Sequence, residues 1–334
     1  MYDGYFVFDN VVHMYDNSPS NKIGAPGQEL ADATIGASQL FSKGEYRGAP
    51  DELKSRAVTV EEATRWLFDE SSTDMAVAQV VPVFDWYRNA FSPIQANYEL
   101  ARANPGRVLF CGGVDPLHQS PRETLAEMKR QIEELGAVSF KFYQSRLDGS
   151  HWRVDDREIA YPMWELCLRH GVTSVQFHKG LPFGRRQRLD DVRPNDIEWA
   201  ARDFPNLNFV IHHLGEPYVD ETVNIAARHP NVWIALSAWI NMFPIMPREC
   251  LHRLGKFLFY VGPDRLMYGS EAFVWPHVEP YIKLMANMEM PEDLQDGYGY
   301  PQLTREIKRK ILGENQARLL GIDIGKKLKE LKRH

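Results

Sequence analysis

The sequence predicts a TIM-type (β/α)₈ barrel with a long insertion after the first strand and extra helices at the C-terminus. Eight short apolar segments recur along the chain, and most of them are followed by an amphipathic, helix-like stretch. Near-continuous apolar runs are typical of parallel strands that are covered on both faces. Eight strands that alternate with helices favour a closed barrel over an open, doubly wound sheet.

The predicted strands cover residues 6–13, 75–84, 107–116, 137–144, 172–180, 207–215, 231–239 and 265–273. The clearest helix is predicted over residues 121–136, where apolar residues from Leu125 to Leu135 recur at three- and four-residue spacing before Gly136. Residues 159–171 and 220–230 show the same apolar spacing and are also predicted to be helices. The segment QLTREIKRKILGENQARLLGI, after the eighth strand, predicts terminal helices.

A long excursion separates the first two predicted strands. Residues 14–74 are rich in Gly, Ser and Pro at first and end in a helical sequence, VEEATRWLFDE. Structureless loops of this length are rare in compact domains, so we expect a lid or an interface. No internal repeat or domain linker is evident, and residues 1–334 are predicted to form a single domain.

Composition excludes several functional classes. The net charge is −6, and the basic run at 326–333 is the solvated end of a predicted helix, so nucleic-acid binding is not expected. Three widely spaced cysteines argue against a disulfide framework. No signal peptide or membrane-spanning run is recognised. These properties predict a cytoplasmic protein that acts on a small molecule.

Potential metal ligands end four of the predicted strands. His13, His178 and Glu271 close strands one, five and eight, and His212 and His213 close strand six. In an α/β barrel these strand ends meet at one mouth, where active sites lie. A single buried histidine is more often a core residue, but four such strand ends at one rim predict a divalent-metal site. We predict His13, His178 and Glu271 as its ligands.

Alternation along a strand refines this prediction. Asp9, Val11 and His13 are spaced by two and should share one face, with Asp9 deepest. Asp9 is then either a further metal ligand, a carboxylate that orients a ligand, or a carboxylate bonded to backbone groups. In the His212–His213 doublet, neighbours face opposite ways, so one histidine is expected to act as acid, base or ligand.

Three further kinds of side chain, a lysine, two tryptophans and three arginines, are candidates for contact with substrate. Lys141 ends strand four and would bind a substrate carboxylate, carry a modification that ligates metal, or extend its charge to solvent. Trp275 follows strand eight and would wall the pocket or pack in the core, and the same holds for Trp239 after strand seven. The arginines at 185, 186 and 188 would gate an anionic substrate or lie in a solvated loop.

Four segments, in this order, resemble motifs of the amidohydrolase superfamily: VQFHKG, VIHHLGEPYVDETVNIAARHPNVWIALS, LMYGSEAF and KILGENQARLLGI. The resemblance covers nearly the whole chain. It is to the amidohydrolase-related branch, which includes aminocarboxymuconate-semialdehyde decarboxylase and the resorcylate-type decarboxylases. It implies that His178 is the strand-five metal ligand and His213 the strand-six catalytic histidine. Two positions depart from the family pattern: Val11 replaces the first histidine of a His-X-His motif, and Glu271 replaces an aspartate.

The resemblance implies hydrolysis or non-oxidative decarboxylation of a small acid. Zn²⁺ or Mn²⁺ would activate water or polarise the substrate carboxylate, and His213 would move the proton. The departures at Val11 and Glu271 favour an alternative function, that of an oxygenase, because two histidines and one carboxylate are the ligand pattern of non-haem iron oxygenases. The chain is similar in outline to the amidohydrolase-like subunits of a 2-aminoisobutyrate hydroxylase.

Such an oxygenase would use one or two iron or manganese ions, a related barrel subunit and a ferredoxin. A third interpretation is a non-catalytic paralogue that keeps the fold as a subunit. In all three cases a homo- or hetero-oligomer is expected.

Overall fold

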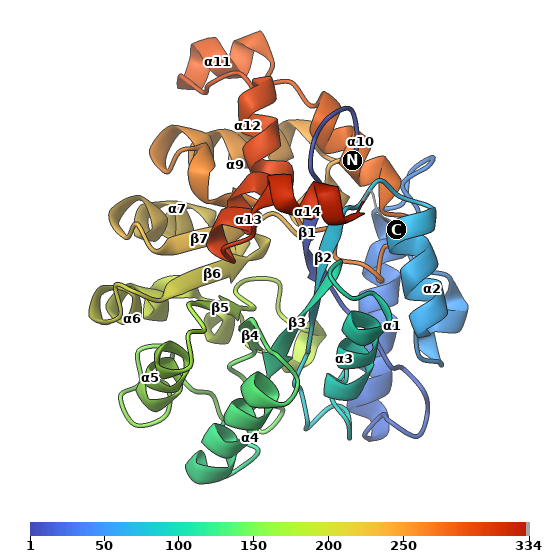
Figure 1. Ribbon diagram of the computed structural model, residues 1–334, viewed down its shortest axis with the longest axis vertical. Coiled ribbons are helices and arrows are strands. Elements are labelled where there is room, and N and C mark those ends of the chain that lie inside the picture. The colour runs from blue at the N-terminus through green and yellow to red at the C-terminus, as the bar shows by residue number, and fades with distance from the viewer. Residues whose placement is uncertain (332–334) are drawn as a thin grey trace.

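The computed structural model, which describes residues 1–331, confirms the barrel (Figure 1). Eight parallel strands are hydrogen-bonded in sequence order, so that each strand lies beside the one that precedes it in the chain. Every observed strand lies inside a predicted one. Their bounds are β1 (Phe8–Val12), β2 (Met75–Gln79), β3 (Val108–Gly113), β4 (Ser139–Phe142), β5 (Ser174–Phe177), β6 (Asn208–His212), β7 (Val232–Ala235) and β8 (Leu266–Met267).

The barrel closes between β8 and β1. The amide of Asn10 donates to the carbonyl of Tyr268 at 3.0 Å, and the amide of His13 donates to the carbonyl of Ala272 at 2.6 Å. These bonds join the last strand and the segment that follows it to the first strand. Closure leaves the sheet without a free edge and brings the ends of β1 and β8 together.

An irregularity in β1 alters the predicted pattern of its side chains. Asp9 pairs with Ala76, but Val12 pairs with Ala78, so three steps along β1 match two along β2. This extra residue is a β-bulge, which interrupts the alternation of faces. The prediction that Asp9, Val11 and His13 share one face is therefore wrong.

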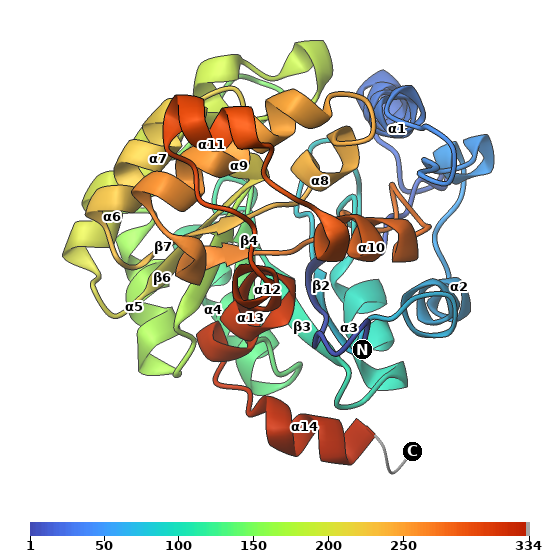
Figure 2. The same cartoon turned by 90° about the horizontal axis from the view of Figure 1, so that it is seen from above.

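Helices cover the outside of the barrel and are separated from the strands by the main hydrophobic core (Figures 1 and 2). The predicted helices at 121–136, 159–171 and 220–230 are confirmed as α4, α5 and α7. A capping box between Ser120 and Glu123 begins α4. The helices that follow β2 to β7 are α3 (Ile94–Ala103), α4 (Pro121–Glu133), α5 (Tyr161–Arg169), α6 (Ile197–Asp203), α7 (Val219–Arg228), α8 (Trp239–Met242) and α9 (Pro247–Tyr260).

The insertion at 14–74 contains α1 (Gly24–Leu40) and α2 (Val60–Thr64). The late helical sequence was predicted, whereas α1 was not, because its glycines and proline hide the helical pattern. Gly27 allows α1 to pack closely, since a Cβ there would lie 2.7 Å from the carbonyl oxygen of Trp86. In Figure 2, α1 lies at the same end of the barrel as α8, opposite α14. This is the end at which the strands finish.

The predicted terminal helices are also confirmed. They are α10 (Glu279–Asn287), α11 (Glu292–Tyr298), α12 (Arg305–Arg309), α13 (Asn315–Leu319) and α14 (Ile324–Leu331). The predicted basic run at 326–333 lies in α14 as far as Leu331, and residues 332–333 fall outside the described part of the chain. Within that part, no helix combines the length and apolar character needed to cross a membrane.

Candidate active site

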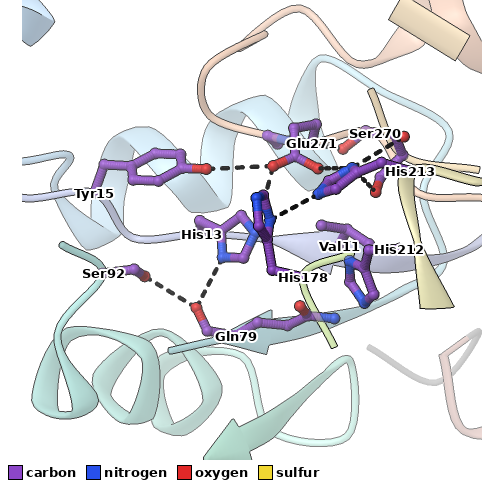
Figure 3. Close-up of polar contacts among 12 residues, drawn as sticks. Val11, His13, Tyr15, Gln79, Ser92, His178, His212, His213, Ser270 and Glu271 are labelled. Carbon is purple, nitrogen blue, oxygen red and sulfur yellow. Dashed lines mark hydrogen bonds and ion pairs between the residues drawn. The ribbon is translucent and has the colours of Figure 1, made fainter. Parts of the chain in front are cut away.

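Four of the predicted side chains meet at the carboxyl ends of the strands. His13, His178, His213 and Glu271 directly follow or lie just beyond β1, β5, β6 and β8 and point toward one another (Figure 3). His13 Nε2 lies 3.6 Å from Glu271 Oε1, and His213 Nε2 lies 3.1 Å from His178 Nδ1. These residues, which are distant in sequence, form one cluster at the mouth of the barrel.

Backbone conformation directs two of these side chains into the mouth. His213 has φ of 57° and Glu271 has φ of 56°, in the left-handed region that residues other than glycine rarely adopt. Such strain costs of order 1–3 kcal/mol per residue and is concentrated at functional sites. His213 directly follows the end of β6, and Glu271 lies in the segment after β8.

Of the histidine doublet, only His213 reaches this cluster. His212 is fully buried, and its Nε2 donates to Gln176 Oε1 at 2.8 Å (Figure 3). The conformation at His213 breaks the strand after His212, so the two rings point in different directions. Contact with the other site residues therefore supports the predicted catalytic role for His213 alone, and His212 belongs to a layer beneath.

The layer beneath the cluster consists of His212 and buried amide side chains, and the amide side chains were not predicted from the sequence. Gln176 Oε1 accepts hydrogen bonds from Asn10 Nδ2 and Gln79 Nε2, both at 3.1 Å, as well as from His212. Asn10, Gln79 and Gln176 are fully or almost fully buried. Polar residues within the apolar strands MAVAQ and SVQF were the available signal. The layer forms a hydrogen-bonded floor under the cluster.

Backbone carbonyls fix the protonation of two site histidines. His13 Nδ1 lies 3.0 Å from the carbonyl oxygen of Gln79, and His178 Nε2 lies 2.9 Å from that of Leu181. Because a carbonyl only accepts, each of these nitrogens carries a proton. In the neutral rings His13 Nε2 and His178 Nδ1 are thus unprotonated. Burial, reinforced by the charge of Lys141, lowers the pKa of both histidines to about 3 and keeps them neutral.

Glu271 and Lys141 introduce opposite charges into this buried space. Tyr15 donates a hydrogen bond to Glu271 Oε1 at 3.4 Å. No group in residues 1–331 forms a hydrogen bond with Glu271 Oε2 or with Lys141 Nζ. Burial raises the pKa of Glu271 and lowers the pKa of Lys141, and in each case the charge of the other opposes the shift. Lys141 is fully buried, so the interpretation in which its charge extends to solvent is wrong.

Asp9 is held by backbone groups through one oxygen, while its Oδ2 has no hydrogen-bond partner within residues 1–331. Its Oδ1 accepts hydrogen bonds from the amides of Val11 at 3.0 Å and Ser270 at 2.9 Å. Of the three interpretations open for Asp9, the structure supports a carboxylate bonded to backbone groups, here across the junction of β1 and the segment after β8. Burial raises its pKa to about 6.

Trp275 packs in the main hydrophobic core, so the structure supports core packing, one of the two interpretations left open for it. Trp239 is likewise in the core, where its Nε1 donates to the carbonyl of Cys250 at 3.0 Å. Trp239 begins α8 and Trp275 lies in the segment after β8, and both pack inward.

The cluster has the ligand types that suit a divalent metal. Two unprotonated imidazole nitrogens and a carboxylate are directed to one region, and each ligand histidine is oriented by a backbone carbonyl through its other nitrogen. Within the described residues, no three His, Cys, Asp or Glu side chains are gathered as closely as a bound ion would hold them. The donor chemistry therefore fits a metal, and binding would draw the side chains closer.

Comparison with protein families identifies the chain. A family model described as amidohydrolase matches residues 52–322. The chain belongs to the amidohydrolase family. This match confirms the resemblance found in the strand-end motifs, and it covers the segments that contribute His178, His213 and Glu271. A comparison with curated proteins gives no match.

Solved structures similar to this amidohydrolase share its fold at low sequence identity. A 5-carboxyvanillate decarboxylase from Sphingomonas paucimobilis is 16% identical, with a TM-score of 0.60 over 96% of this chain and 100% of that chain. A 2,6-dihydroxybenzoate decarboxylase from Rhizobium is 16% identical, with a TM-score of 0.59 over 95% and 99%. A manganese-bound 5-carboxyvanillate decarboxylase from Novosphingobium aromaticivorans is 13% identical, with a TM-score of 0.60 over 96% and 97%. None of these comparisons supports the oxygenase alternative.

Proposed function

We propose that this amidohydrolase is a metal-dependent hydrolase or non-oxidative decarboxylase that acts on a small carboxylate-bearing substrate. The observation that carries the proposal is the convergence of His13 Nε2, His178 Nδ1 and the Glu271 carboxylate at the barrel mouth. Family membership supports it, as do the similar structures named as decarboxylases, one of which contains manganese.

His13, His178 and Glu271 would hold the ion. A bound divalent metal supplies the ability to polarise a substrate carboxylate or to lower the pKa of bound water. The unprotonated nitrogens of both histidines are available because the backbone carbonyls of Gln79 and Leu181 occupy the opposite ring positions. Tyr15 and the buried surroundings orient the carboxylate of Glu271.

His213 would move the proton. Burial, together with the neighbouring His178, lowers its pKa well below the usual value, so that the ring is neutral and able to accept a proton. Its Nδ1 lies 3.1 Å from the hydroxyl oxygen and 3.3 Å from the carbonyl oxygen of Ser237. Because His178 Nδ1 is unprotonated and lies 3.1 Å from His213 Nε2, Nε2 carries the proton of the neutral His213 ring and Nδ1 accepts from the Ser237 hydroxyl. With a metal on His178 Nδ1, His213 Nε2 would be free to give its proton to the substrate and to take one back.

Lys141 would bind the substrate carboxylate. Its ammonium group is fully buried, lies 5.4 Å from the centroid of the Tyr143 ring, and has no hydrogen-bond acceptor within residues 1–331. A buried cation with unused donors is costly unless a partner completes its contacts. An anionic substrate would complete them, and its carboxylate would then lie next to the ligands of the metal.

The direct test combines metal analysis with an activity screen. Protein supplied with Mn²⁺, Zn²⁺ or Fe²⁺ should retain stoichiometric metal after desalting. A panel of small carboxylates, beginning with 5-carboxyvanillate and 2,6-dihydroxybenzoate, should then be screened for loss of CO₂ or for hydrolysis. If none of the three metals is retained, the proposal is overturned.

Replacing Lys141 by Met should weaken substrate binding more than metal binding. Loss of a buried charged partner costs several kcal/mol, so we expect kcat/KM for the carboxylate substrate to fall by about 100-fold or more. Metal content should stay at the wild-type level. The control is the binding of the same compound with its carboxylate converted to an amide, which cannot lose CO₂: its dissociation constant should not distinguish the variant from the wild type, whereas that of the carboxylate should. Equal loss for both compounds would exclude carboxylate binding by Lys141.

Cation binding should depend on pH near neutrality. Burial raises the pKa of Glu271 to about 7, so protons compete with the metal for this carboxylate as the pH falls below that value. The affinity for Mn²⁺ should then fall by up to about tenfold per pH unit between about pH 7 and 5. His13 and His178, with pKa values of about 3, do not take up protons in this range. The Glu271→Gln variant should bind more weakly and lose this dependence, and an unchanged pH profile in that variant would contradict the assignment.

A further inference from the structure

The histidines of the candidate active site are almost fully covered in this structure. His13, His178 and His213 are 1%, 5% and 4% exposed, whereas the side chain of Glu271 is 12% exposed, so solvent reaches the carboxylate more readily than the rings. A surface groove of about 340 Å³ lies nearby, between α1 and the segment that follows β5. Leu30 and Trp86 contribute to its walls, and Phe183 and Arg186 come from the segment after β5. The groove is therefore a candidate route from solvent to the site.

Phe183 contacts both the groove and the site. Its ring centroid lies 4.8 Å from that of His178 and 5.4 Å from that of Tyr143, which itself stacks on His178. On its other side, Phe183 packs edge-on against Trp86 at 6.2 Å. A single side chain therefore stands between the groove and one of the predicted metal ligands.

An ion-pair cluster ties the segment that carries Phe183 to α1. Glu29, on α1, accepts hydrogen bonds from Arg186 Nε at 2.7 Å and Arg186 Nη2 at 2.8 Å, and from Arg185 at 3.4 Å. All of these groups are at least one-third exposed. Exposed ion pairs contribute little stability, so this connection can open and close readily.

The same segment is anchored at its base by different contacts. The amide of Leu181 donates to the carbonyl of Glu216 at 2.8 Å, and the amide of Phe183 donates to Gln187 Oε1 at 2.7 Å. Gly184 adopts φ of 58°, which glycine tolerates without strain. The base is thus fastened to the barrel through Leu181. The Phe183–Gln187 bond lies within the segment, and Gln187 in turn donates to Ser145 Oγ, whereas Arg185 and Arg186 are held to α1 by exposed charges.

We infer that the groove is the entrance vestibule for a small organic anion and that Phe183 is its gate, held shut by the ion pairs of Glu29 with Arg185 and Arg186. A carboxylate-bearing molecule in the groove competes with Glu29 for the two arginines, which releases the segment and moves Phe183 off His178. The inference rests on the proposed function only in taking the histidine cluster as the place that a substrate has to reach.

The test measures access to His178 directly. Wild-type protein and variants are treated with diethyl pyrocarbonate, and modification of His178 is followed by mass spectrometry relative to the exposed His277. Glu29→Gln should raise the relative rate by about threefold, since only exposed ion pairs are lost. Phe183→Ala should raise it by about tenfold or more, since the ring itself is removed. Metal content is measured alongside, because a bound ion would also protect the ring.

Glu221→Gln is the matched control. Glu221, on α7, forms a similar two-bond ion pair with Arg193, at 2.7 and 2.8 Å, and neither residue lines the groove. This variant should leave the relative rate unchanged. Equal protection of His178 in the wild type and in both gate variants would overturn the inference. Because labelling does not depend on turnover, failure to find metal or activity would count against the proposed function and leave the gate result intact.

Discussion

Replacing His178 by Ala is expected to remove most of the bound metal while the barrel stays folded. His178 offers an unprotonated Nδ1 to the cluster, and its Nε2 is already bonded to the carbonyl of Leu181. Loss of groups that only orient a metal ligand typically costs 10- to 100-fold in affinity, so loss of the ligand itself should cost more than about 100-fold. Metal content after desalting, together with a Mn²⁺ titration, measures the effect.

Two variants make this result interpretable. His277→Ala removes an exposed histidine and should bind metal like the wild type. His178→Asn keeps a polar side chain in the buried position and serves as a second test in case His178→Ala unfolds. Circular dichroism shows whether each variant is folded. Full occupancy in folded His178→Ala protein would exclude His178 as a ligand.

Replacing His213 by Asn should abolish most turnover without comparable loss of metal. Proton transfer by a positioned side chain typically contributes a factor of about 10² to 10⁴, and we expect kcat to fall within this range. His213 is neutral and buried, and its Nε2 faces the cluster, which is the geometry that a proton carrier requires. Single-turnover kinetics on metal-loaded protein measures the chemical step.

Ser237→Ala provides a graded comparison for His213. It removes the hydroxyl that lies 3.1 Å from His213 Nδ1 but keeps the backbone carbonyl at 3.3 Å, so the decrease in kcat should be smaller, about tenfold. If His213→Asn instead lost its metal in parallel with its activity, His213 would be a ligand and the proton would have to be carried by another group.

The amino-acid sequence by itself determined the barrel and the types of residue at its mouth. Strand identity follows from short apolar runs, which are local in the chain, and every observed strand lies within a predicted segment. The positions of His13, His178 and Glu271 at strand ends were equally visible, because the carboxyl ends of parallel barrel strands face the same side. Convergence of these residues required no knowledge of detailed packing.

Only the tertiary structure decided which neighbouring side chains take part. The bulge in β1 removes Asp9 from the face of His13, and the left-handed conformation at His213 separates it from His212. Both depend on how adjacent strands pair and end, which a period-two pattern does not record. The burial of Lys141 and the packing of Phe183 between His178 and Trp86 arise from contacts between segments far apart in sequence. Local patterns carry no information about such contacts, because they form only when the chain closes into a barrel.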